Sequence, residues 1–330
     1  MAINHSNRII PFMIIVLAPI CLSVIFGIPL GNYLFNPNGC QINRLPYIIR
    51  SSGYYCLDRD LNAIWGGITV NADNVIIDFN GYSMNGSQNP NNTYYGISAE
   101  NRSNIQVRNG SITGFLYAIN FNDIAYKQGV PYETGWHIID NMNISYATFR
   151  GIVIRGNENL IQNNTIQYIQ GNLVYENSFA IGIESTGPNV VIRDNFVYEV
   201  RGMGSTDIGE GIGISITDHG DNSTITTNTV INDTIELSPV DKESGLSRST
   251  WAIWVGGESS GMISYNEIDN YMFGIAFTST TKNSLIHDNI IIHSYAPITL
   301  TNTEIYLTYN NNCEFENCLI GLNPIPTREP

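Results

Sequence analysis

Short alternations of apolar and polar residues recur along most of this chain, and one phrase dominates them. It consists of an aliphatic residue, two arbitrary residues, an asparagine, one arbitrary residue and a second aliphatic residue. Clean copies occupy residues 161–166, 192–197, 225–230, 263–268 and 286–291, a first copy occupies 77–82, and copies with the asparagine one place earlier occupy 107–112 and 139–144. Because each unit can bury its apolar face only against the next, the repetition predicts a solenoid.

A second phrase, a small residue followed by Ile and an apolar alternation, lies upstream of most of these copies. It occurs at residues 96–97, 118–119, 151–152, 180–181, 252–253 and 274–275. These runs are too short for helices. Their alternation with period two, their β-branched residues and the flanking Gly and Asn predict short strands.

Each repeat is therefore expected to hold two or three strands joined by tight turns. Asparagine is expected at the bend, where its side chain can bond local backbone and tolerate left-handed dihedral angles. Stacked coils place asparagine over asparagine at the inter-strand spacing of about 4.8 Å. The sequence predicts an all-β fold, a single-stranded right-handed parallel β-helix of about nine to ten coils, preceded by an N-terminal transmembrane helix.

The repeats, together with Ser-Gly-Tyr-Tyr-Cys-Leu at residues 52–57 and the run at 67–81, resemble the pectate-lyase-like β-helix superfamily. Within it they look most like the generic surface or exported repeat proteins. The resemblance covers roughly residues 52–310 and implies a fold without implying a function. A β-sandwich or a propeller, the alternative folds, would need hairpin turns at regular spacing, whereas the repeat length here varies.

The repeat runs through nearly all of the 330 residues, so one solenoid is the simplest domain count. We expect a signal anchor or transmembrane segment at residues 1–31 and an N-terminal cap and linker at 32–66. The β-helix is expected at 67–305, and a C-terminal cap and tail at 306–330.

The N-terminus predicts export. Residues 9–30 carry no charge and are long enough to cross a bilayer, and Arg8 lies just upstream. We expect an uncleaved anchor with the β-helix outside the cytoplasm, at a cell surface, in the periplasm or on a virion surface. The alternatives are a cleaved signal peptide, which would leave a secreted protein, and a buried core helix.

Cysteine placement agrees with export. Cys40 and Cys56 lie near the first coil, and Cys313 and Cys318 follow the last one. The even count outside the apolar segment predicts two disulfides that staple the ends, most simply Cys40 with Cys56 and Cys313 with Cys318. A metal site at the second pair is the alternative, although no His lies near it.

Charge narrows the range of partners. A formal net charge of −14 with only 15 Lys and Arg leaves no basic stripe for nucleic acid. An acidic polysaccharide would also be repelled unless a divalent cation intervened. Carbohydrate remains the expected partner, the membrane is expected through residues 9–30, and a homotrimer is one open oligomeric state.

Insertions concentrate after the asparagine phrase and before the next small-Ile phrase, at residues 83–95, 169–180, 198–211 and 232–250. Loops inserted at the same place in stacked coils lie on one side, so they would wall a groove beside the first strand of each coil. Many polysaccharide-processing β-helix enzymes and several noncatalytic sugar-binding relatives use such a groove, so the resemblance implies this location.

Strand alternation then selects the side chains that face this groove. The third residue after the Ile of each small-Ile phrase should point outward, in one column. Its members are Glu100, Asn122, Arg155, Glu184 and Thr217, with Arg155 and Glu184 as neighbours across one rung. Trp254, with Trp251 just before it, is expected outward in a later coil, where an exposed indole suits a sugar ring.

The turn Thr-Asp-His-Gly-Asp at residues 217–221 holds the densest cluster of proton-transfer and metal-capable groups. A carboxylate and an imidazole there could abstract a sugar C5 proton, with Arg155 or a bound Ca²⁺ stabilising the intermediate. The candidate catalytic residues are Asp218, His219, Glu184 and Arg155, and the candidate substrate-binding residues are Trp254, Trp251, Glu100, Asn122, Asp207 and Glu210. The alternative is a solvated turn beside an ordinary salt bridge between Arg155 and Glu184.

The catalytic patterns of polygalacturonases, alginate epimerases and pectate lyases are missing, so no catalytic residue is carried over from those families. A noncatalytic surface protein, glycan-binding or structural, is therefore the favoured function. A carbohydrate-active enzyme, either a polysaccharide lyase, an epimerase or a hydrolase, is the alternative. Ca²⁺ is the one cofactor considered.

Overall fold

The computed structural model describes residues 41–89, 91–123, 132–171, 180–201, 211–233, 250–278, 284–300, 306–309 and 311–313. The chain divides into two compact units, residues 1–40 and 41–330, and every described residue belongs to the second. The predicted membrane segment at residues 9–30 lies outside the described part. Within the described part, no helix has the length and apolar character needed to cross a membrane.

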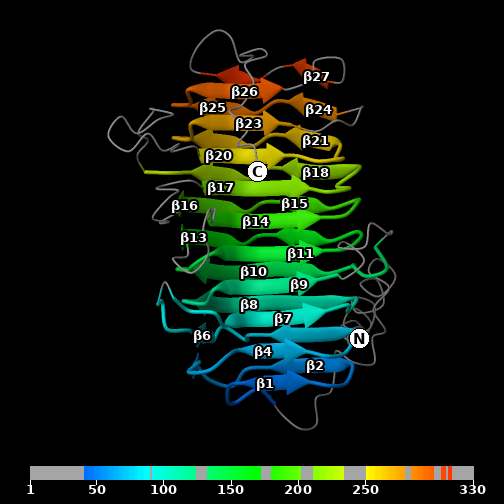
Figure 1. The fold of residues 1–330 in the computed structure, drawn as a ribbon, viewed down its shortest axis with the longest axis vertical. Coiled ribbons are helices and arrows are strands. Elements are labelled where there is room, and N and C mark those ends of the chain that lie inside the picture. Colours follow the sequence, from blue (N-terminus) through cyan, green and yellow to red (C-terminus); the bar gives the residue numbers. More distant parts are fainter. Residues whose placement is uncertain are drawn as a thin grey trace, which may run out of the picture. The chain divides into compact units, whose positions relative to one another are not determined.

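The described residues wind into ten coils, and each coil adds strands to a stack (Figure 1). The first face is a ten-stranded parallel sheet. Its strands are β1 (Tyr47–Ile49), β4 (Ile68–Val70), β7 (Tyr95–Glu100), β9 (Tyr117–Asn122), β11 (Arg150–Arg155), β14 (Ala180–Thr186), β17 (Gly211–Thr217), β20 (Thr250–Val255), β23 (Phe273–Phe277) and β26 (Ala296–Leu300).

The second and third faces follow in each coil and are joined by a short bend, here called the second bend. The second face comprises β2 (Gly53–Cys56), β5 (Val75–Asp78), β12 (Leu160–Gln162), β15 (Val191–Arg193), β18 (Ser223–Thr226), β21 (Gly261–Ser264), β24 (Ser284–His287) and β27 (Tyr306–Tyr309). The third comprises β3 (Leu61–Asn62), β6 (Ser83–Asn85), β13 (Thr165–Gln170), β16 (Phe196–Arg201), β19 (Thr229–Ile231), β22 (Glu267–Asp269), β25 (Ile290–Ile292) and β28 (Asn312–Cys313). Two long strands, β8 (Ile105–Thr113) and β10 (Ile138–Ser145), run through both faces.

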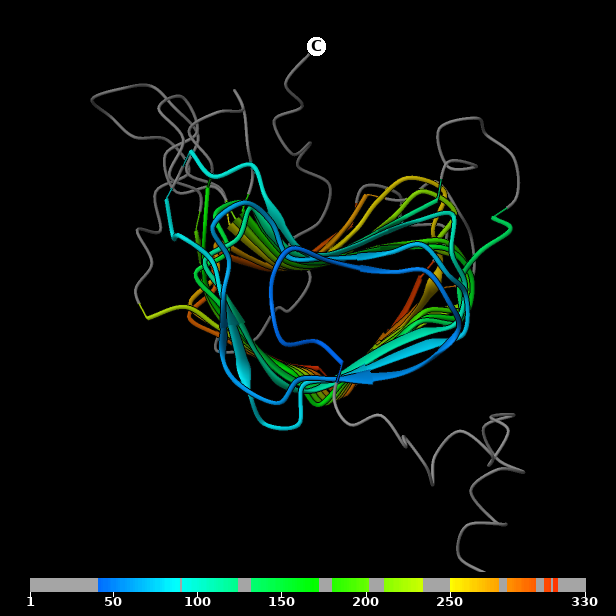
Figure 2. The ribbon, with the colours of Figure 1, turned by 90° about the horizontal axis from the view of Figure 1, so that it is seen from below.

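Every strand pairing among the described residues is parallel and joins one coil to the next, as in β5 with β8 or β14 with β17. The chain is therefore a parallel β-helix, and the predicted all-β solenoid is confirmed. Figure 2 shows the coils superposed around a common interior. Parallel pairing begins at β1 and reaches β28, so the stack extends on both sides of the predicted range 67–305.

The interior is filled by rows of aliphatic side chains that repeat at each coil. On the first face one row is in register from strand to strand, and all of its members are inaccessible to solvent. The row consists of Ile97, Ile119, Ile152, Ile183, Ile214, Ile253, Ile275 and Ile298, with Ile68 at its start. Period-two alternation explains this row, because one residue in two must point into the solenoid.

Asparagine stacks on asparagine at the second bend, as the repeated phrase predicts. The stack runs through Asn164, Asn195, Asn228, Asn266, Asn289 and Asn311. From Asn164 to Asn289, each Nδ2 donates to the Oδ1 of the next asparagine at 2.9–3.0 Å. All six Nδ2 groups also donate to a carbonyl oxygen of the preceding coil at 3.0–3.1 Å. The stack thereby satisfies buried polar groups where the strands bend.

The left-handed backbone angle at this bend belongs to a different residue from the one predicted. It falls on the residue before the stacked asparagine: Asn163, Asp194, Thr227, Tyr265 and Asp288. The copies with asparagine one place earlier place Asn109 and Asn141 in this left-handed position, while Gly110 and Met142 stand at the stacking position. The two kinds of phrase therefore use asparagine for two different purposes.

Cysteine chemistry is visible at both ends of the stack. Cys56 in β2 and Cys313 in β28 are each disulfide-bonded. Their predicted partners, Cys40 and Cys318, lie outside the described residues, so the pairing stays a prediction.

Candidate functional site

The first face carries the predicted outward column, with one exception. Glu100 pairs in register with Asn122, and Arg155 pairs with Thr186, which pairs with Thr217. Thr186, and not Glu184, therefore completes the column. The small-Ile phrase that continues the row is Gly182-Ile183, since Ile183 pairs with Ile152. Ala180-Ile181 has the same small-Ile pattern two residues earlier. Because strand alternation has a period of two residues, the sequence pattern does not distinguish the two.

Glu184 nevertheless meets Arg155, as predicted, and a second arginine that the sequence did not indicate. Its Oε1 lies 3.5 Å from Nη2 of Arg155 and its Oε2 lies 3.1 Å from Nε of Arg150. Arg155 Nη1 donates to Asn122 Oδ1 at 2.7 Å. The guanidinium of Arg150 also lies 3.8 Å from the centre of the Phe149 ring. Burial lowers the pKa of Arg150, and the neighbouring Glu184 charge opposes that effect.

A turn follows β17, as the sequence predicts. Asp218 and His219 both have left-handed backbone angles, and the Asp218 carbonyl accepts a hydrogen bond from Tyr132 Oη at 3.2 Å. His219 Nδ1 lies 3.3 Å from Oε2 of Glu258, and both side chains are more than half exposed. Asp207 and Glu210 lie outside the described residues. The proposed acid and base roles of this turn remain predictions.

The two tryptophans are half-buried, where the sequence predicted exposed indoles. Trp251 stacks on Phe273, with ring centroids 5.6 Å apart and an interplanar angle of 12°. Trp254 Nε1 donates to Thr278 Oγ1 at 2.9 Å. Both rings pack against a buried cluster that includes Phe273 and Ala276. One flat side of Trp251 is therefore occupied by a protein ring.

The insertions predicted to wall a groove connect the third face to the first. Residues 172–179, 202–210 and 234–249 of these insertions lie outside the described part. Their described ends are stacked in register, with Gln170 beside Arg201 on the third face and Ala180 beside Gly211 on the first. These insertions therefore begin and end at equivalent positions of successive coils. The groove along the first face remains a prediction.

A groove of about 540 Å³ lies elsewhere, on the outer side of the second bend. It crosses coils two to five, and its lining combines the left-handed asparagines with residues at the start of the third face. The lining residues are Asp78, Asn80, Gly81, Asn109, Gly110, Asn141, Met142, Asn143, Asn163 and Thr165. We call it the amide groove. Its volume falls in the range of small-ligand sites.

Asparagine side chains in the amide groove are held in place by one another. Asn141 Nδ2 donates to Asn109 Oδ1 at 3.0 Å, and Asn109 Nδ2 lies 3.3 Å from both oxygens of Asp78. Asn163 Nδ2 donates to Asp140 Oδ1 at 2.9 Å. Left-handed backbone angles set the direction in which the Cα–Cβ bonds of Asn109, Asn141 and Asn163 leave the backbone. The groove therefore presents amides in fixed orientations.

A wider turn in coil two lies at one end of the amide groove. Four residues, 79–82, separate the paired positions Asp78 and Ser83, whereas two residues, 109–110, separate the corresponding positions in coil three. The extra backbone places Asn80 and Gly81 on the surface. Phe79 fills the space beneath, because a Cβ on Gly110 would lie 2.1 Å from the Phe79 Cβ. This crowding explains why glycine stands at the stacking position of coil three.

The amide groove holds one ionisable side chain, and its charge is compensated. Asp78 Oδ2 accepts a hydrogen bond from Arg108 Nε at 2.8 Å, and Asp78 Oδ1 accepts one from the backbone N–H of Asn80 at 2.9 Å. In the described part of the chain, no group of three or more His, Cys, Asp or Glu side chains is placed to hold a metal ion.

Comparison with known proteins identifies solved structures whose backbone is similar to that of this chain. No family model matches the chain, and no curated protein matches it. Among solved structures, an alginate lyase from Paenibacillus sp. str. FPU-7 shares 12% identity at a TM-score of 0.45, over 79% of this chain and 88% of that one.

Two further solved structures are similar to a comparable degree. A tailspike mutant of E. coli bacteriophage HK620, in complex with a pentasaccharide, shares 10% identity at a TM-score of 0.42, over 80% of this chain and 54% of that one. The catalytic domain of a GH87 α-1,3-glucanase, in complex with nigerose, shares 14% identity at a TM-score of 0.41, over 83% of this chain and 63% of that one. Similarities this low carry no conclusion about function.

Proposed function

We propose that this protein is a noncatalytic, carbohydrate-binding surface β-helix whose ligand lies in the amide groove. The observation that carries the proposal is the groove itself, a concavity of about 540 Å³ lined by asparagines on four successive coils. Export through the N-terminal segment, with the β-helix outside the cytoplasm, is part of the same proposal.

Amides suit sugar hydroxyls because both groups donate and accept hydrogen bonds. An asparagine side chain carries two N–H donors and an oxygen with two lone pairs. Asn80, Asn141 and Asn163 are exposed at the groove, so the capacity they do not use within the protein is available to a ligand. The amides of Asn141 and Asn163 are already held by hydrogen bonds within the protein, which lowers the entropy lost on binding.

The charge distribution favours a neutral sugar. Arg108 compensates Asp78, so the groove offers no net charge to an ionic ligand. The formal net charge of the whole chain is −14, which would repel a polyanion. Asp78 is the one titratable group in the groove lining and its oxygens already accept hydrogen bonds, so the groove lacks an acid and base pair for hydrolysis or elimination.

A glycan array probed with the full-length chain tests the proposal. The protein is best produced in a bacterial host, because Asn143-Ile-Ser145 would be an acceptor for N-glycosylation elsewhere. We expect binding to neutral glycans, weakened at least fivefold by Asn143→Ala and by Thr165→Val, which removes a hydroxyl and keeps the branched shape. Glu100→Gln, an exposed change on the first face, serves as the control.

Two results would overturn this assignment of the site. One is an absence of binding to every neutral glycan on the array. The other is binding that survives both groove variants and is lost with Trp254→Ala, which would place the ligand on the first face.

A second candidate function is a carbohydrate-active enzyme working on the first face. The contact of Glu184 with Arg150 and Arg155, beside Asn122, favours it because these groups could bind and polarise a sugar. Release of reducing ends or unsaturated products from a glycan panel, abolished by Glu184→Gln in protein that circular dichroism shows to be folded, would support the enzyme. Silence across the panel with and without Ca²⁺ would exclude it for those glycans.

A further inference from the structure

One register column of the third face leads from the amide groove past coil five. Asn143 pairs with Thr165, and Thr165 pairs with Phe196 in coil six. The first two line the groove, and Phe196 is 39% exposed. An exposed aromatic ring therefore lies one coil beyond the groove, in register with its lining residues Asn143 and Thr165.

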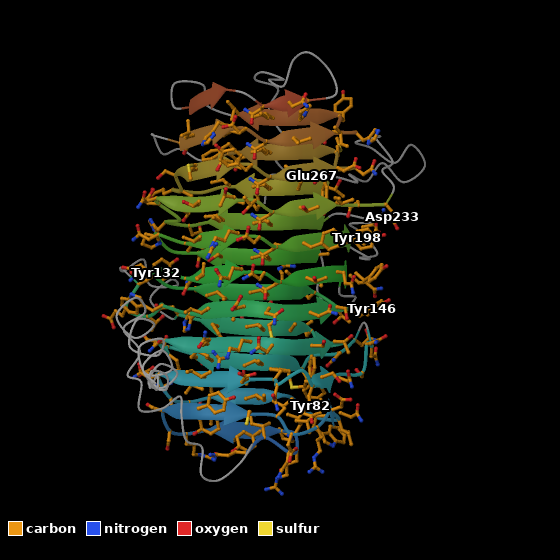
Figure 3. All side chains as sticks on the ribbon, turned by 180° about the vertical axis from the view of Figure 1, so that it is seen from behind. Tyr82, Tyr132, Tyr146, Tyr198, Asp233 and Glu267 are labelled. Atoms are coloured by element: carbon orange, nitrogen blue, oxygen red, sulfur yellow. The ribbon has the colours of Figure 1, made fainter. Side chains whose placement is uncertain are left out.

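Neighbouring rings hold this aromatic residue in place. The rings of Phe196 and Tyr198 are stacked, with centroids 5.9 Å apart and an interplanar angle of 15°. Tyr168 meets Tyr198 edge to face at 5.4 Å, and Tyr146 stacks on Tyr168 at 5.1 Å. Figure 3 shows Tyr146 and Tyr198 on the same side of the stack as Tyr82, which belongs to the wide turn of coil two.

Tyr198 is anchored at its far end as well. Its hydroxyl shares a hydrogen bond with the Asp233 side chain, and this bond is the main cause that raises the pKa of Tyr198 above its ordinary value. A ring fixed by both stacking and a hydroxyl bond loses little freedom on binding, which is how aromatic platforms gain affinity.

The two ends of this surface differ. The wide turn at residues 79–82 lies at the coil-two end of the groove, whereas the column runs on past Phe196 to Thr229 and Glu267. From coil two to coil six there are four inter-coil steps of about 4.8 Å, or roughly 19 Å in all. A short sugar could fill the amides, but only a longer chain could also reach Phe196.

We infer that Phe196 and Tyr198 form a stacking subsite that extends the amide groove, so that the ligand is a linear neutral glycan lying parallel to the solenoid axis. This inference rests on the proposed function. A linear glycan matches the surface because its sugar units advance along one line, as the coils do, and meet an equivalent polar group at each step. Sugar rings also offer a flat apolar face to an aromatic ring while their hydroxyls reach the amides.

Calorimetric titration of the full-length chain with a length series of one neutral glycan, from disaccharide to hexasaccharide, tests the inference. We expect Phe196→Ala to weaken hexasaccharide binding about tenfold and to leave disaccharide binding unchanged, because only the longer chain reaches the ring. Thr165→Val should weaken both ligands. Phe196→Leu, which keeps apolar bulk without a flat ring, should behave like Phe196→Ala.

The matched control is Ile290→Ala, because Ile290 is an exposed apolar residue in the same register column, three coils beyond Phe196. It should bind both ligands as the unaltered protein does. If the Phe196 variants bind the hexasaccharide normally while Thr165→Val does not, the stacking subsite is refuted and the amide groove stands.

Two other outcomes also decide against the inference. If the unaltered protein binds no member of the series or any other neutral glycan, the proposed function falls with it. If Phe196→Ala dissociates an oligomer, as measured by sedimentation, this aromatic surface is a contact between copies of the chain and not a sugar subsite.

Discussion

Single residues at the second bend decide how the coils turn. Each buried asparagine in the stack satisfies donors and acceptors of three coils, while the residue before it accepts the left-handed angle. The sequence shows the asparagines plainly, but not which of two adjacent positions performs which task. Both positions tolerate asparagine, one for its hydrogen bonds and the other for its left-handed backbone.

Removing one stacked amide should therefore be costly. Asn228 Nδ2 donates to Asn266 Oδ1 and to Ile192 O, and Asn228 Oδ1 accepts from Asn195. Asn228→Ala leaves several of these buried groups without partners, so we expect a loss of about 2–4 kcal/mol in the free energy of unfolding, measured with denaturant. Asn143→Ala, at an exposed position, should cost less than about 0.5 kcal/mol. Equal losses in the two variants would show that the stack is not stabilising.

A buried histidine should make stability depend on pH. His137 is almost fully buried and accepts a hydrogen bond from Ile105 N–H at Nδ1, and burial lowers its pKa to about 3. The unfolded chain, with an ordinary pKa near 6.5, binds a proton more readily than the folded one between about pH 6.5 and pH 3. The contribution of His137 to the free energy of unfolding is therefore fully present above about pH 6.5 and is lost as the pH falls toward 3.

Between pH 7 and pH 5, the proton uptake of His137 in the unfolded chain should lower the free energy of unfolding by about 2 kcal/mol. His137→Asn should be less stable than the unaltered protein at pH 7, and its stability should fall by about 2 kcal/mol less over that interval. Denaturant unfolding at both pH values measures the effect. Parallel pH profiles for the two proteins would show that His137 is not the titrating group.

At the scale of strands, register separates what the sequence predicts well from what it does not. The inward Ile row is recoverable, because a buried position tolerates few residue types. The outward column was misplaced at Glu184, since Ala180-Ile181 and Gly182-Ile183 satisfy the same alternation and differ by one full period. Outward side chains meet no packing constraint that would choose between them.

An inward charge tests the register directly. Ile214 lies between Ile183 and Ile253 and is inaccessible to solvent. Ile214→Asp would bury an unpaired carboxylate between coils, so we expect no folded protein by circular dichroism. Thr224→Asp, on an outward half-buried position of β18, should fold normally. A folded Ile214→Asp protein would contradict the register.

The ion-pair cluster on the first face makes a separate prediction. Glu184 lies between Arg150 and Arg155, and all three side chains are at most 20% exposed. Glu184→Gln removes the carboxylate that two largely buried arginines share, so we expect a loss of about 2–4 kcal/mol in unfolding free energy, measured with denaturant. Glu100→Gln is the exposed control. An unchanged stability would mean that the pairs contribute nothing net.

For the molecule as a whole, repetition makes the fold predictable and leaves the site obscure. Eight copies of one phrase suffice to predict stacked parallel coils, because no isolated unit could bury its apolar face. The amide groove depends on two extra residues in coil two and on outward asparagines, which in sequence are indistinguishable from ordinary bend residues. The regular repeat therefore predicts the solenoid but not the position of the amide groove, which lies beside the wide turn at residues 79–82.

The most direct test of the central claim is a crystal structure of the protein soaked with the neutral oligosaccharide that binds it best. We expect density for a linear sugar chain along the second bend, with hydroxyls bonded to Asn141 and Asn163 and one ring against Phe196. Sugar density on the first face, beside Glu184 or Trp254, with an empty amide groove would contradict the account.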